Sequence, residues 1–272
     1  MTKPRRRDGH AAAAAMLLLA AAHAVPARAQ DGPIEDNSFL IEEAYNQEPR
    51  VVQHISTLLW NEESSEWASS FTQEWPAPGQ SHQLSYTLLY VRQSEDRGWG
   101  DVALNYRYQL RGLGDDRVAI APRVSLLLPT GNAGDGLGAG SPGVQFNLPV
   151  SAVLGEALIG HWNAGATFVP DAEAPNGAEA DVSALQLGQS FVWLLRPKLN
   201  LMLETVWASA ETVTASGGSE REESFVVSPG VRFAIDLPSG LQIVPGLAVP
   251  IGVGPSVGDW SLFLYLSFEH PF

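Results

Sequence analysis

The sequence lacks cysteine, basic residues are scarce in it, and beyond its N-terminus it has no long apolar run. The absence of cysteine among 272 residues excludes a disulfide framework and a thiolate metal site. Lys and Arg number 16 against 30 Asp and Glu, and the formal charge is −14. Such an acidic chain does not bind nucleic acid through its bulk charge. No apolar run after the N-terminus approaches the roughly 18 residues of a transmembrane helix.

The N-terminus has the pattern of a secretory signal peptide. Four basic residues lie between Lys3 and Arg7, residues 11–22 are apolar, and Ala27-Arg28-Ala29 precedes Gln30. A basic region, a short apolar region and an A-x-A site are read by the export machinery and then removed. We therefore expect residues 1–29 to be a signal peptide that is cleaved after Ala29.

The C-terminal stretch WSLFLYLSFEHPF (260–272) indicates a membrane strand. Its residues alternate, with one apolar row that includes Leu262, Leu264 and Leu266, and one mixed row that includes Ser261 and Ser267. A period of two is typical of a strand. An apolar face toward lipid, a mixed face toward the lumen and a final aromatic residue are typical of the closing strand of an outer-membrane β-barrel.

The rest of the chain repeats this pattern. We predict strands at about 51–60, 66–75, 82–92, 99–111, 117–128, 142–154, 157–169, 182–195, 198–210, 224–236, 240–251 and 260–270. Tight links such as 155–156 and 196–197 alternate with longer links such as 170–181 and 211–223. Short turns at one rim and long loops at the other are typical of outer-membrane barrels. Prolines inside strands, such as Pro122 and Pro149, are expected at bulges or rims.

These observations predict an all-β protein, a transmembrane antiparallel up-and-down β-barrel of about twelve strands preceded by a signal peptide. We expect residues 1–29 to be the signal peptide, residues 30–50 a periplasmic lead-in or a short helix near the barrel mouth, and residues 51–272 the barrel. The expected location is the outer membrane of a Gram-negative bacterium. The expected partners are outer-membrane lipids, the barrel-assembly machinery through the strand that ends in Phe272, and a small-molecule solute, with no nucleic acid. Trp side chains near the strand ends predict two aromatic girdles.

Two stretches carry a resemblance to a known family. IEDNSFLIEEAYNQEPRVVQHI (34–55) resembles the start of the bacterial family labelled MetA-pathway of phenol degradation. LLLPTGNAGDGLGAGSPGVQFNLPVS (126–151) and HWNAG (161–165) resemble its mid-barrel pattern. The resemblance implies an outer-membrane, transporter-like barrel linked to aromatic compounds, and it carries over no catalytic residue. Arg50 occupies a turn where we expect glycine in relatives.

The candidate site is the polar row that faces the lumen. It is expected to include Asp101, Asn105, Arg107, Arg123, Gln145, Asn147, His161, Asn163, Lys198, Glu204, Arg232 and Asp236. Arg107, Arg123, Glu204, Arg232, Asn105 and His161 are the candidate solute-binding residues. Charges of both signs in a pore provide a wet path for polar or anionic solutes. The alternative is structural, because buried charges can pair with one another and fill a narrow interior.

The leading hypothesis is therefore a channel or transporter for small solutes, including hydrophobic or aromatic ones, rather than an enzyme. A structural envelope barrel with a filled lumen is the first alternative. An outer-membrane lipase or esterase is the second, because His54 and Ser56 share a face; it needs a third group such as Asn163 or Asn105 to orient the histidine. No cofactor, metal site or catalytic residue is expected otherwise.

Overall fold

The computed structural model describes residues 34, 38–113, 116–237 and 241–271. The predicted signal peptide and Phe272 lie outside these described residues. The strands are β1 (Val51–Asn61), β2 (Trp67–Pro76), β3 (His82–Gln93), β4 (Asp96–Trp99), β5 (Val102–Tyr108), β6 (Val118–Ile120), β7 (Arg123–Leu128), β8 (Gly143–Gly155), β9 (Leu158–Glu173), β10 (Glu179–Arg196), β11 (Leu199–Val213), β12 (Ser219–Phe233), β13 (Ile235–Asp236), β14 (Gln242–Ala248), β15 (Ile251–Gly252) and β16 (Ser261–Pro271). Single turns of 3₁₀ helix lie at Ala133–Asp135 and Gly254–Ser256.

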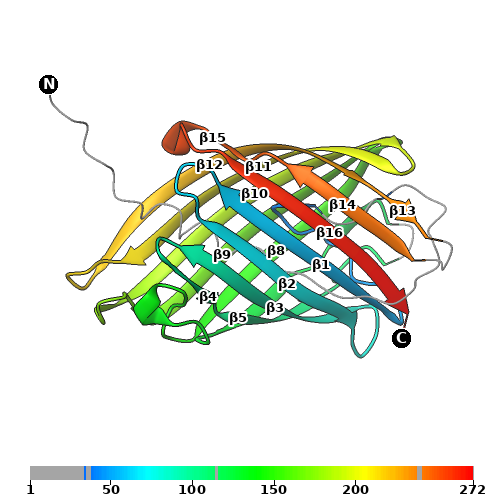
Figure 1. Ribbon diagram of the computed structural model, residues 1–272. Helices are drawn as coiled ribbons and strands as arrows, with labels where there is room; N and C mark the ends of the chain where they lie inside the picture. The colour runs from blue at the N-terminus through cyan, green and yellow to red at the C-terminus, as the bar shows by residue number, and fades with distance from the viewer. Residues whose placement is uncertain (1–33, 35–37, 114–115, 238–240, 272) are drawn as a thin grey trace, which may run out of the picture.

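These segments form one closed antiparallel barrel of twelve strands. Each strand pairs with its neighbours along the chain, and β1 pairs with β16 from Val51↔Pro271 to Asn61↔Ser261. Figure 1 shows this closure as the blue strand β1 lying beside the red strand β16. Four of the twelve strands are interrupted, so that β4 with β5, β6 with β7, β12 with β13, and β14 with β15 each form one wall strand. The predicted fold class is confirmed.

The predicted register of the last strand is also confirmed. Phe263 and Tyr265 of β16 are 0% and 4% exposed, whereas Leu264 and Leu266 between and beyond them are 41% and 40% exposed. The exposed row continues around the barrel on leucine and aromatic side chains, among them Leu104, Leu126, Phe146, Leu148, Leu187, Leu201 and Leu203. An outward apolar surface is typical of barrels that lie in lipid.

Aromatic side chains gather near both ends of the barrel wall. Near the long-loop end, Trp60 and Trp260 lie 6.0 Å apart, and Tyr90 lies 5.1 Å from Trp99. Near the short-turn end, Trp162 lies edge-on to Phe191 at 6.2 Å. Amphipathic rings at these two levels form the girdles that the sequence predicts.

The alternation of turns and loops holds, but two of the predicted long loops are mostly strand. Strands β9 and β10 extend beyond their predicted ends and leave only residues 174–178 as a turn. Strands β11 and β12 likewise leave residues 214–218. Gly177 and Gly217 adopt positive φ angles of 80° and 77° in these tight turns, a conformation that glycine allows without strain. The extended hairpins therefore project from the wall at this rim.

The short helix predicted within residues 30–50 is not found in the described part of that stretch. Residues 38–50 form bends and a turn instead. Backbone groups of this stretch form hydrogen bonds with side chains of the barrel wall. These bonds replace the hydrogen bonds that a helix would make within the segment. Among the described residues, no helix is long and apolar enough to cross a membrane.

Candidate functional site

A segment of the chain that precedes β1 lies inside the barrel. We call Ile34 with residues 38–50 the lumen segment. Its backbone N–H groups donate to wall side chains at distances of 2.7–3.1 Å: Phe39 and Leu40 to Glu204, Glu42 to Asn163, Ala44 to Ser151, Asn46 to Gln109, and Gln47 to Gln83. Each such bond contributes about 0.5–1.5 kcal/mol, and more where the acceptor is charged. The segment is therefore held by many weak bonds rather than by one strong one.

The wall contacts place this segment in the short-turn half of the lumen. Ile34 accepts hydrogen bonds from Asn200 and Arg232, which lie at the short-turn ends of β11 and β12. From there the contacts pass around the interior, through β11, β9, β8 and β5, to Gln83 at the start of β3. The segment thus crosses the lumen at the level of these wall residues.

Two wall amides bind the segment as a neighbouring strand would. Asn163 donates to the carbonyl oxygen of Glu42 at 2.7 Å and accepts from the N–H of the same residue at 3.0 Å. Gln109 donates to the carbonyl oxygen of Ala44 at 2.6 Å and accepts from the N–H of Asn46 at 2.8 Å. A side-chain amide offers one donor group and one acceptor in this geometry. The buried backbone of the segment is thereby satisfied without a β-ladder.

Arg107 on β5 clamps the segment with both charge and hydrogen bonds. Its guanidinium donates to the carbonyl oxygens of Glu43 (3.1 Å) and Tyr45, and to Asn46 Oδ1 (2.9 Å). Carboxylate oxygens of Glu42, Glu43 and Glu74 lie 3.9, 3.5 and 3.9 Å from it. A buried guanidinium needs such compensation, because leaving it unpaired would cost several kcal/mol.

Arg107 and Arg123 lie opposite one another on the paired strands β5 and β7. Glu42 of the lumen segment bridges them, at 2.6 Å from Arg123 Nη2 and 3.9 Å from Arg107 Nη1. Like charges directly across a strand pair destabilise it, and the carboxylate between them removes that repulsion. Burial alone would raise the pKa of Glu42, but the guanidinium groups of Arg123 and Arg107 outweigh it and hold the pKa below 4.5.

Glycines in the wall make room for the apolar side chains of the segment. Phe39 packs between the rings of Phe263 and Tyr265, at centroid distances of 5.5 and 5.1 Å. A Cβ on Gly246 would overlap its ring, and a Cβ on Gly230 would lie 2.9 Å from its Cε2 atom. The lumen thus contains a socket for one aromatic ring, which Phe39 fills.

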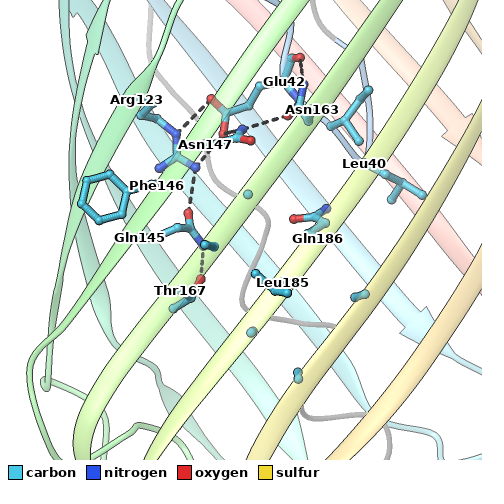
Figure 2. Close-up of a pocket in the computed structure, with 16 residues that line it drawn as sticks. Leu40, Glu42, Arg123, Gln145, Phe146, Asn147, Asn163, Thr167, Leu185 and Gln186 are labelled. Atoms are coloured by element: carbon cyan, nitrogen blue, oxygen red, sulfur yellow. Dashed lines mark hydrogen bonds and ion pairs between the residues drawn. The ribbon is translucent and has the colours of Figure 1, made fainter.

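A recess of about 520 Å³, part of it open to solvent, lies beside the segment. Figure 2 shows Glu42 and Arg123 pointing toward one another at its polar side, with Gln145 joining Arg123 to Thr167. Small side chains of β9, β10 and β11 leave this space free; its lining includes Gly165, Ala184, Ala208 and Ala210, with Leu40 and Ile41 of the segment. The recess is therefore polar on one side and apolar on the other.

The structure places all six candidate solute-binding residues on the inner face. Asn105 accepts hydrogen bonds from Arg123 (3.0 Å) and Ser125 (2.6 Å), and His161 Nδ1 bonds Ser151 Oγ at 2.7 Å. Glu204 binds the segment backbone, and Arg232 donates to the carbonyl oxygen of Ile34 at 3.1 Å. Arg107 and Arg123 meet through Glu42, whereas Glu204 and Arg232 contact different parts of the segment.

Three other residues of the predicted lumen row lie at the rims. Asp101 accepts N–H bonds from Gly131 and Ala139 of the long loop between β7 and β8, so it orders that loop. Lys198 pairs with Asp236 near the short-turn end, where the lysine side chain is 54% exposed. Sequence reasoning missed Glu42, Glu43 and Gln109. Glycines on the inner face, such as Gly188 and Gly246, are the signal that something occupies the lumen.

The structure places His54 and Ser56 on one face of β1, as the sequence predicts, but separates them from the proposed third group. Their cross-strand partners on β16 are Phe268 and Leu266, which belong to the outward row, and the His54 ring stacks on Phe268 at a centroid distance of 4.7 Å. Asn105 and Asn163 face the lumen, on the other side of the wall. Alternation of side chains along a strand therefore separates the proposed base from both proposed orienting groups. In the part of the chain that the structure describes, no three His, Cys, Asp or Glu side chains gather as metal ligands.

Comparisons with known proteins find the fold but no family. No family model and no curated protein matches the chain. The structure is similar to an outer membrane channel from Pseudomonas putida F1, with a TM-score of 0.64 and 17% identity over 84% of this chain and 98% of that chain. It is also similar to the NanC porin, with a TM-score of 0.53 and 8% identity over 79% of this chain and 98% of that one. The fold is that of outer-membrane β-barrels.

Proposed function

We propose that this protein is a channel of the bacterial outer membrane for small solutes, including hydrophobic or aromatic ones, and that its lumen segment obstructs the pore at rest. The observation that carries the proposal is the placement of the segment. It crosses the lumen, is held to the wall by hydrogen bonds and ion pairs, and leaves a recess beside it. Withdrawal of the segment would clear the level of the lumen that it now crosses.

The outer face and the structural neighbours support the membrane location. Exposed leucines such as Leu187 (55%) and Leu203 (46%) suit hydrocarbon rather than water. The two similar solved structures are described as an outer membrane channel and a porin. The socket around Phe39 supports the aromatic part of the proposal, because a solute ring would fit where that ring now lies. The resemblance to the MetA-pathway of phenol degradation family points the same way.

A reversible lock on the segment tests the proposal. A Cβ on Gly188 would lie 3.5 Å from Ile41 Cβ, within the range that a disulfide spans. Because the chain has no cysteine, the double variant Ile41→Cys/Gly188→Cys would contain one defined pair. We expect purified protein in planar bilayers to stay closed when oxidised and to conduct after reduction. The single variant Ile41→Cys, treated identically, controls for effects of the reductant.

The filled-lumen structural barrel is the second candidate, and one observation favours it. Arg107 is 3% exposed and is surrounded by three carboxylates and two backbone carbonyls, as in a permanent interior. In that case the reduced double variant would carry no more current than the oxidised one. Equal and negligible conductance in both states, with folded protein in the bilayer, would overturn the channel proposal.

A further inference from the structure

The arginine pair on β5 and β7 faces Glu42 of the lumen segment, which bridges it. We propose that Arg123, with Arg107 opposite, binds the carboxylate of a small monoanionic solute with an apolar body, and that Glu42 occupies this site while the lumen segment is in place. The inference rests on the proposed channel function and names its solute class. Glu42 then acts as an internal substitute for the solute carboxylate.

The wall itself positions the guanidinium of Arg123. Its Nη1 atom donates to Asn105 Oδ1 at 3.0 Å and to Ser125 Oγ, and its Nη2 atom donates to Gln145 Oε1 at 2.7 Å. All of these acceptors belong to the barrel. The remaining edge, Nε and Nη2, faces Glu42 at 3.0 and 2.6 Å. A guanidinium edge of two parallel donors is the geometry that binds a carboxylate in a bidentate manner.

This edge therefore stays in place when Glu42 leaves. A site whose donors are already oriented by other bonds loses little conformational freedom on binding, and this favours affinity. Asn147, which donates to Glu42 Oε1 at 3.0 Å, adds a third wall donor for the same carboxylate. The barrel thus keeps a complete carboxylate cradle that does not depend on the segment.

The recess shows what kind of solute can reach the cradle. The Glu42 side chain is 31% exposed and lines the recess, so that an incoming group meets the Arg123–Glu42 contact directly. Leu40, Ala184, Ala208 and Ala210 line the same recess and suit an apolar body. A carboxylate at the polar side with a hydrocarbon ring or chain against the small side chains fills both surfaces.

Charge balance selects a monoanion. Two guanidinium groups here face the carboxylates of Glu42, Glu43 and Glu74. Release of the segment removes both Glu42 and Glu43 and leaves Glu74 alone against two guanidinium groups. One solute carboxylate would restore equal numbers of the two charges, whereas a neutral solute would leave one guanidinium without a counter-charge. Because solute and Glu42 compete for the same donors, binding of the solute favours release of the segment.

Binding of benzoate to the detergent-solubilised full chain, measured by calorimetry, tests the inference, with benzamide as the neutral isostere. We expect benzoate to bind and benzamide not to. Glu42→Gln should bind benzoate about tenfold more tightly, because the internal competitor is weakened. Arg123→Gln should abolish binding, and Arg123→Lys, which keeps the charge but loses the fork, should weaken it about tenfold or more. Arg221→Gln, at the long-loop rim, is the matched arginine control and should bind as the parent does.

Equal affinity of the parent, Glu42→Gln and Arg123→Lys for benzoate would overturn the inference, and so would equal binding of benzamide. If Arg123→Gln does not fold, the other two variants still decide. Conductance measurements distinguish a failure of the channel proposal from a failure of the carboxylate site. Current through the reduced Ile41→Cys/Gly188→Cys protein without selective benzoate binding would support the channel proposal and contradict the carboxylate site. Selective benzoate binding without current would support the carboxylate site and contradict the channel proposal.

Discussion

The ring of Phe39 occupies the place that a side chain at Gly246 would take. A Cβ on this glycine would overlap the ring and would lie 3.3 Å from Tyr265 Cβ on the adjacent strand. The fit between the lumen segment and the wall thus depends on the absence of one methyl group, and that dependence gives a direct way to displace the segment.

We expect Gly246→Ala to loosen the lumen segment and raise conductance without preventing barrel assembly. Overpacking of this kind costs about 1–3 kcal/mol, and the segment can relieve it by moving whereas the wall cannot. The measurement is the frequency of open events in planar bilayers. Gly155→Ala is the control, since a Cβ there meets no atom within 4 Å. Adding Phe39→Ala to Gly246→Ala should allow the segment to bind again; an unchanged open frequency in the double variant would contradict the steric explanation.

The channel should open more readily in acid. The pKa of Glu42 lies below its ordinary value of 4.5 while the segment is bound, so the bound state is favoured by the ionised carboxylate. That contribution is fully present above pH 4.5 and is lost as the pH falls through the lowered pKa. Conductance measured at pH 7 and at about pH 3 should therefore rise in acid. In Glu42→Gln the part of this rise that comes from Glu42 should vanish, and an identical pH profile in both proteins would assign the effect to another group.

An arginine on the outer face should destabilise the barrel in a bilayer. Leu203 lies on β11 and is 46% exposed on the outward row. We expect Leu203→Arg to cost about 2–4 kcal/mol in the free energy of unfolding from lipid vesicles, because the charge would lie in hydrocarbon. The measurement is the urea midpoint for loss of the folded band on gels. Gln186→Arg, which lies in the recess, is the matched control, and equal losses in both would show that Leu203 does not face lipid.

Arg50 should be replaceable by glycine with a gain in stability. It lies in the turn before β1 with a φ angle of 68°, in the left-handed region that costs a non-glycine residue about 1–2 kcal/mol. We expect Arg50→Gly to raise the free energy of unfolding by up to about 1 kcal/mol, since part of the gain is offset by the flexibility of glycine in the unfolded chain. Arg92→Gly, inside strand β3, should instead lower it by about 0.5–1 kcal/mol. A loss of stability in Arg50→Gly would contradict the strain argument.

The barrel could be predicted from the sequence because the alternation of side chains along a strand is a local pattern. In β16, one alternating stretch fixes which of Phe263 and Leu264 faces lipid, and no distant residue is needed for that assignment. The turn at Arg50 was expected from the family resemblance rather than from a local pattern. The ends of β9 and β10 could not be predicted from the sequence. Their polar tips continue the ladder outside the membrane, where no apolar pattern marks them.

The occupant of the lumen could not be predicted in the same way. Glu42 meets Arg123 across 81 positions of sequence, and the N–H of Phe39 meets Glu204 across 165. Such contacts depend on closure of the whole barrel, and residues 38–50 show no strand or helix period that would reveal their place. The lumen charges were identified by their face, but the partner that neutralises them comes from a stretch that was expected to be a periplasmic lead-in or a short helix near the barrel mouth.

The wall recognises the main chain of its occupant more than its side chains. Most of the bonds that hold residues 39–47 end on a backbone nitrogen or oxygen, which every amino acid except proline supplies in full. The amino-acid sequence of this stretch can therefore vary widely while its position in the barrel is preserved. Only a few positions require a particular shape or charge. The foremost are Phe39, for its ring, and Glu42, for its carboxylate.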